Sequence, residues 1–177
     1  MLNGRIDAAG NRIPGTGLLE KAQKEYDEAK AAIEKDKDSF WGRQYSDDEG
    51  IERYRNAENK LNDLLAIKKA LEGEDISLVA LEFGERGENV RAALAIGDVD
   101  NAKHVTTFVP GMTTSCRTST DLNLGYARNL IDAAETAGRA EKGSVAAVAW
   151  MGYDAPPDPW ETANPSVMFP GKAQAGA

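Results

Sequence analysis

The chain has 177 residues, of which 41% are hydrophobic and 28% charged, and its net charge is −8 at neutral pH. These values are typical of a soluble globular protein with one core, or of a small domain with a helical appendage. The negative charge argues against a nucleic-acid partner, and the single cysteine excludes an internal disulfide and a thiolate metal cluster.

A helical hairpin is predicted over residues 17–73, after a Gly-, Pro- and Asn-rich start at 1–16 that we expect to be flexible. Apolar residues recur every three or four positions, with charged residues between them. Ser46 and Glu49 form a capping box at the start of the second helix, and Gly73 marks its end. The short link between the helices indicates an antiparallel pair. The apolar positions are Leu18, Ala22, Tyr26, Ala29 and Ile33, then Ile51, Tyr54, Leu61, Leu64, Leu65 and Leu71.

After the hairpin the pattern changes from helix to strand. The segments 76–83, 90–98 and 105–109 are predicted as strands joined by short turns. A helix follows at 119–138, capped near Ser119 or Thr120, and a fourth strand at 144–150 is apolar almost throughout. This order predicts an α/β fold of about four strands with one crossover helix.

The third strand, the helix and the fourth strand form a βαβ unit, so the two strands should run parallel. We expect 105–109 to be a central strand. We expect 144–150 to lie at an open edge that favours self-association or a complementary chain. Loops at the carboxyl ends of parallel strands are where open α/β sheets bind ligands. The two loops that follow these strands, PGMTTSC and GYDAPP, should therefore lie on one edge of the sheet.

Three motifs stand at characteristic intervals: IGDVDNA at 96–102, VPGM at 109–112 and AWMGYDAP at 149–156. On these motifs, the chain from about Leu64 to Pro157 resembles the opening half of an uncharacterised bacterial family of α/β hydrolases. The resemblance implies a partial hydrolase domain over 74–157, followed by an irregular Pro-rich tail at 158–177. It also implies that one loop helps to form an oxyanion hole, and that two later residues line the neighbouring rim. The loop residues are Gly111, Met112 and Thr113, and the rim residues are Tyr153 and Asp154.

No G-x-S-x-G motif occurs in the 177 residues, although the family places its Ser, Asp or Glu, and His after this point. We therefore interpret the chain as a fragment of an α/β hydrolase that hydrolyses esters or amides in its complete relatives. The fragment should be inactive alone. The substrate is not readable from the sequence. The alternative function is a non-catalytic interaction module that acts through the helical hairpin.

Several other residues carry less specific signals. Cys116 lies among hydroxyl residues, but without a positioned base it is more typical of an inert thiol. His104 begins the strand whose far end carries the loop, which favours a surface role. Asp98, Asp100 and Asn101 resemble a metal-binding loop, but Asp and Asn also favour turns by themselves. We expect no metal and no cofactor.

No apolar run approaches the ~20 residues of a membrane span, and the start of the chain has no apolar core of a secretion signal. We therefore expect no membrane span. The cytoplasm is the default compartment, with non-classical secretion left open.

Overall fold

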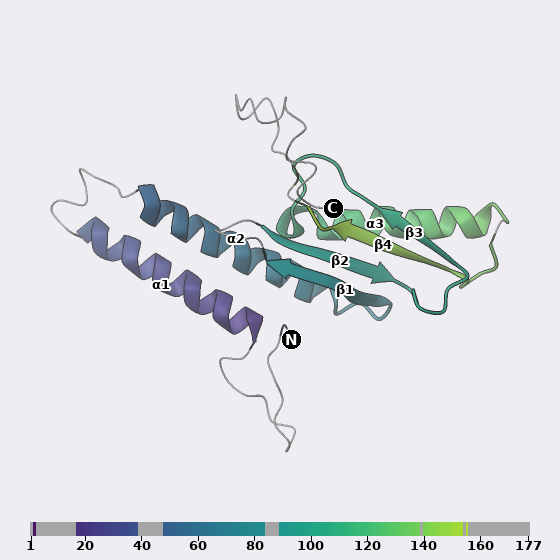
Figure 1. The fold of residues 1–177 in the computed structure, drawn as a ribbon, viewed down its shortest axis with the longest axis horizontal. Helices are drawn as coiled ribbons and strands as arrows, with labels where there is room; N and C mark the ends of the chain where they lie inside the picture. The colour runs from purple at the N-terminus through teal and green to yellow at the C-terminus, as the bar shows by residue number, and fades with distance from the viewer. Residues whose placement is uncertain are drawn as a thin grey trace, which may run out of the picture.

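The computed structural model describes residues 2, 17–38, 48–83, 89–138, 140–153 and 155. Over these residues the chain forms a helix pair, then a four-stranded mixed sheet with a helix packed against it, which confirms the predicted α/β class (Figure 1). The elements are α1 (Leu18–Asp38), α2 (Asp48–Ala70), β1 (Ile76–Phe83), β2 (Val90–Ile96), β3 (His104–Phe108), α3 (Cys116–Thr136) and β4 (Val145–Met151).

The strands lie in the order β1-β2-β4-β3. β2 is antiparallel to β1 and to β4, whereas β3 and β4 are parallel, with Val105 opposite Ala146. The connection from β3 to β4 passes through α3, so the predicted βαβ unit is confirmed.

Two predictions about this sheet are wrong. We expected the strand at 105–109 to be central and the strand at 144–150 to lie at the edge, but β4 lies between β2 and β3, and β3 is an edge strand. The physical reason is burial. Val145, Ala146 and Ala149 of β4 are buried, so this strand needs cover on both sides. β3 carries His104 and two threonines, and Val105 is 51% exposed, so it tolerates an edge.

The core lies between one face of the sheet and the helices. Alternate residues of β2 and β4 face one another across this side, with Leu94 opposite Ala149 and Ile96 opposite Ala147. Leu64 of α2 belongs to the same buried cluster. In Figure 1, α3 lies behind β3 and β4, and α2 lies beside β2. Residues of α1, α2, α3, β2 and β4 thus share one hydrophobic core, which explains why the helix pair is held against the sheet.

The helix pair at the N-terminal side is confirmed. The rings of Tyr26 and Tyr54 contact each other with centroids 5.4 Å apart, and Lys60 pairs with Glu25 at 2.9 Å. α2 begins at Asp48, and the proposed capping residue Ser46 lies outside the described residues. In the parts of the chain that are described, no helix is long and apolar enough to cross a membrane.

The start of α3 differs from the prediction. The helix begins at Cys116, and Ser115, with extended backbone angles, is its N-cap residue. The prediction placed the cap at Ser119 or Thr120, four or five residues too late. Hydroxyl residues occur at almost every position from 113 to 120, and each one is a suitable cap by type. The pattern of residue types therefore did not identify the first helical residue.

Candidate functional site

The loop that joins β3 to α3, residues 109–115, lies at the carboxyl ends of the two parallel strands. Tyr153 follows β4 on the same edge, and its hydroxyl donates hydrogen bonds to the carbonyl oxygens of Pro110 and Gly111, the second at 3.1 Å. His104 pairs with Val145 at the opposite ends of the strands. Because the two strands are parallel, Tyr153 lies at the loop, and the His104 imidazole lies at the opposite end of the strands. Asp154 lies outside the described residues.

Three consecutive residues of the loop are exposed. Pro110 is buried, whereas Gly111, Met112 and Thr113 are exposed, and a Cβ added at Gly111 would meet no atom within 4 Å. Within the described part of the chain, the backbone N–H groups of these three residues have no protein acceptor. The hydroxyl of Thr114 donates instead to the Gly111 carbonyl at 2.8 Å. Within the described residues, the loop thus leaves these three N–H groups without an acceptor, while its carbonyls are partly used internally.

Thr113 has a strained backbone. Its φ angle is 63°, and it is the one non-glycine residue with positive φ in the described ranges. A β-branched side chain disfavours this conformation. Such strain is often found at functional loops, where the surrounding structure holds it in place.

We expect Thr113→Gly to raise the free energy of unfolding by about 1 kcal/mol, because glycine relieves the ~1–2 kcal/mol cost of the left-handed conformation. Equilibrium urea unfolding would measure this change. The matched control is Thr114→Gly, for which we expect a loss of about 0.5–1 kcal/mol, since that residue has no positive φ to relieve. Destabilisation by both changes would show that the backbone at 113 is not strained.

Cys116 is unsuited to nucleophilic attack. Its side chain is 1% exposed, and its Sγ donates to the Val90 carbonyl at 3.2 Å. Burial raises the pKa of the thiol to about 12, and the nearby Asp63 carboxylate adds to this rise. The single histidine of the chain, His104, begins the far end of β3. Among the described residues, the thiol therefore has no access to a substrate, and the His104 imidazole is not placed to activate it.

A buried carboxylate at the starts of β2 and α3 was missed by the sequence analysis. Asp63 of α2 has no exposed surface and accepts hydrogen bonds from the backbone N–H groups of Val90 and Arg117. One signal could have identified it. Asp63 stands four residues before Ile67 and seven before Ala70, on the buried stripe of the helix, where a charged residue needs a specific partner.

The acidic turn after β2 is held by its own side chain. The carboxylate of Asp98 accepts hydrogen bonds from the backbone N–H groups of Asp100 and Asn101 at 3.1 and 3.2 Å, and from the Asn101 amide at 2.7 Å. These bonds lower the pKa of Asp98. The segment has the geometry of an Asx turn. Among the residues that the structure describes, no group of three or more Asp, Glu, His or Cys side chains could hold a metal ion.

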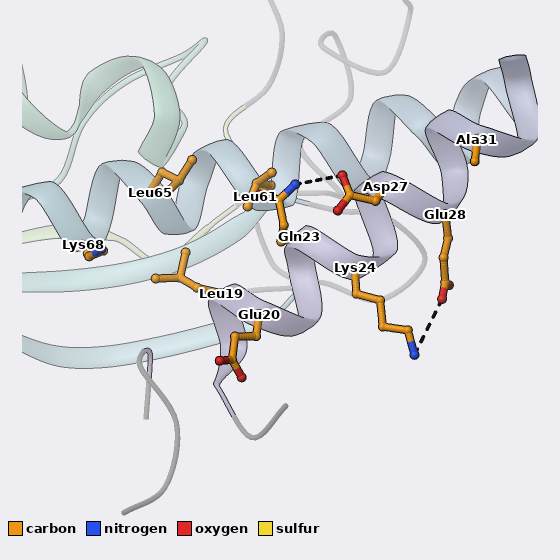
Figure 2. A pocket seen from close by; sticks show the side chains of 10 residues that line it. All are labelled: Leu19, Glu20, Gln23, Lys24, Asp27, Glu28, Ala31, Leu61, Leu65 and Lys68. Carbon is orange, nitrogen blue, oxygen red and sulfur yellow. Dashed lines mark hydrogen bonds and ion pairs between the residues drawn. The ribbon is translucent and has the colours of Figure 1, made fainter. Parts of the chain in front are cut away.

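An open groove of about 690 Å³ runs between α1 and α2 (Figure 2). Leu19, Leu61 and Leu65 line it together with charged residues of both helices. Three of the charged side chains on α1 are paired within the helix: Asp27 accepts from Gln23 at 3.0 Å, and Glu28 lies 3.7 Å from Lys24. Leu65 is 45% exposed, so the groove leaves apolar surface open to solvent.

Comparison with known proteins gives one family and several relatives. A family model described as alpha/beta hydrolase matches residues 86–177. The uncharacterised protein Rv2079 of Mycobacterium tuberculosis is 36% identical over 132 residues, which cover 71% of this chain and 19% of the relative. The uncharacterised protein Rv0963c of the same organism is 36% identical over 103 residues, or 55% of this chain and 39% of the relative. The chain thus spans about a fifth to two fifths of these relatives. No solved structure matches it significantly.

Proposed function

Because the chain belongs to the alpha/beta hydrolase family, whose model matches residues 86–177, we propose that it supplies the oxyanion loop of an acyl-transfer hydrolase. The substrates would be esters or amides. The observation that supports this most directly is the position of Gly111, Met112 and Thr113. They lie between the carboxyl end of a parallel strand and a helix, and their N–H groups have no protein acceptor in the described residues. In α/β hydrolases the loop after the third strand supplies one of the oxyanion donors.

The chemistry assigned to the loop is electrostatic. When a nucleophile attacks the carbonyl carbon of the substrate, the carbonyl oxygen gains negative charge, and N–H groups fixed nearby stabilise that charge. Tyr153 would act as a rim residue that holds the loop through the Pro110 and Gly111 carbonyls. The nucleophile and its base would come from outside these 177 residues, in which no G-x-S-x-G motif occurs.

The outer edge of β3 is where we propose that a further strand pairs. The nucleophile must lie beside the 109–115 loop, and β4 already occupies one side of β3. A strand from a complementary chain or segment would therefore pair with the other side of β3. The apolar face next to this edge includes Leu122 and Tyr126 of α3, with Tyr126 against Phe108 at 5.3 Å between ring centroids.

We expect the purified chain to show no measurable hydrolysis of p-nitrophenyl acetate, because a nucleophile is required for turnover through an acyl-enzyme. The measurement is release of p-nitrophenolate against a buffer blank. Burst kinetics that are abolished by Cys116→Ala would contradict the proposal and make the thiol catalytic.

The positive test uses a chimera in which residues 48–155, which include Asp63, replace the corresponding segment of Rv0963c. If the chimera hydrolyses the ester, Met112→Pro, which removes one loop N–H, should lower kcat by about 10²–10³-fold. Leu130→Ala, on the exposed surface of α3, is the control and should leave kcat unchanged. An active chimera that is insensitive to Met112→Pro would show that this N–H is not an oxyanion donor.

The second candidate function is an interaction module, and the groove between α1 and α2 favours it. Its exposed Leu65, beside the half-buried Leu19, would receive an apolar helix of a partner protein. Leu65→Asp in the full chain should then abolish binding to that partner. Binding that survives this change would count against the interaction module.

A further inference from the structure

The N-terminal end of α3, directly after the 109–115 loop, lacks the usual local cap. Ser115 occupies the N-cap position, but its hydroxyl makes no cap hydrogen bond and pairs with the Thr118 hydroxyl at 2.8 Å. The first turn of the helix contains no acidic residue. A helix of this length normally satisfies its first N–H groups with a side-chain oxygen and favours negative charge at this end.

Asp63 of α2 supplies both missing features from another element. Its Oδ1 accepts the backbone N–H of Arg117 at 2.7 Å, which is the bond that an N-cap side chain would ordinarily make. Its carboxylate also places negative charge at the positive end of the helix dipole. The cap of α3 is therefore provided by a residue 54 positions earlier in the chain.

The same carboxylate holds the beginning of β2. Its Oδ2 accepts the backbone N–H of Val90 at 3.0 Å. The guanidinium of Arg117 donates to both carboxylate oxygens at 3.2 Å and to Asn89 Oδ1 at 2.7 Å. One side chain thus fixes the starts of β2 and α3 relative to each other and to the helical hairpin.

If Asp63 only filled space in the core, a buried carboxylate would be an unfavourable choice of side chain. Burial raises the pKa of Asp63, and the donors from Arg117 and Val90 oppose that rise. An apolar residue of similar size would avoid the penalty of burying a charge. The advantage of a carboxylate is that its two oxygens accept hydrogen bonds in defined directions. They therefore fix the orientation of two backbone N–H groups. The first turn of α3 is covalently continuous with Ser115 and the loop before it.

We propose that Asp63 is a positioning residue for the 109–115 loop, so that the N-terminal hairpin is part of the functional site. The hairpin residue lies outside the segment matched by the family model, residues 86–177. The role of this positioning in catalysis rests on the proposed function. The positioning itself is argued from the hydrogen bonds of Asp63. The other end of the loop is held by the pairing of β3 and by Tyr153, so Asp63 anchors the end that these contacts leave free.

The test compares loop order in the full chain and in Asp63→Asn, by ¹⁵N relaxation of the amides from Gly111 to Ser115. The amide cannot accept at both former oxygens, so one of the Val90 and Arg117 donors loses its acceptor. We expect lower order parameters across the loop and faster amide exchange at Val90 or Arg117. The matched control is Asp75→Asn, which likewise leaves one acceptor oxygen for the two Arg128 donors farther along α3, at 2.7 and 2.8 Å in the native chain, and should leave the loop unchanged.

A rescue separates capping from general stabilisation. Ser115→Asp places an acceptor at the N-cap itself, so Asp63→Asn combined with Ser115→Asp should regain loop order. If Asp63→Asn does not fold, recovery of folding in the double variant supports the inference, and failure of both variants to fold overturns it. An unchanged loop in Asp63→Asn, or an equal loss of order in Asp75→Asn, also overturns it. These measurements need no catalysis, whereas an inactive chimera counts against the proposed function alone.

Discussion

Leu64→Ala is expected to lower the free energy of unfolding by about 2–5 kcal/mol. Leu64 has no exposed surface and belongs to the buried cluster that contains residues of α2, β2, α3 and β4. Removing its side chain leaves a cavity that the surrounding strands and helices fill only in part. The loss should be large because the residue joins the hairpin to the sheet.

The neighbouring residue provides the control. Leu65 is 45% exposed and lines the groove between α1 and α2, so Leu65→Ala should cost much less, within about 1 kcal/mol. Chemical denaturation followed by far-UV circular dichroism and by tryptophan fluorescence would measure both changes. Equal losses for the two variants, or unfolding of the hairpin separate from that of the sheet, would contradict a shared core.

Native Cys116 should react with iodoacetamide at pH 8 about a thousand times more slowly than the same thiol in the unfolded chain. Burial raises its pKa from 9.0 to about 12, so the reactive thiolate fraction falls by roughly three orders of magnitude. Because the native pKa lies above the unfolded value, the neutral thiol is the form that folding favours. Its 1% exposure slows access further.

Mass spectrometry of the alkylated protein over time would measure this rate. The reference is the same chain in guanidinium chloride, and Cys116→Ala gives the background from other side chains. Comparable rates in the native and unfolded states would place the thiol at the surface. That result would reopen a role for Cys116 at the loop.

Much of the fold follows from local patterns that the sequence contains. Over residues 17–73, apolar residues recur every three or four positions, and after Gly73 the pattern changes to extended apolar segments. Both patterns are properties of neighbouring residues. The parallel relation of β3 and β4 follows from the helix between them, since a crossover of this kind has one favoured arrangement. The same reasoning placed the 109–115 loop and Tyr153 on one edge, and the hydrogen bond from Tyr153 to the Gly111 carbonyl agrees with it.

The tertiary structure alone decided three features. The place of β4 between β2 and β3 depends on which strand most needs burial, and chain order does not encode that competition. The start of α3 at Cys116 was hidden among hydroxyl residues that are all suitable caps. The cap from Asp63 joins residues 54 positions apart, and no local pattern describes a hydrogen bond between a helix in the hairpin and a helix after the sheet. Residue types and spacings determined the elements by themselves, whereas contacts across the core determined their order and the anchoring of the loop.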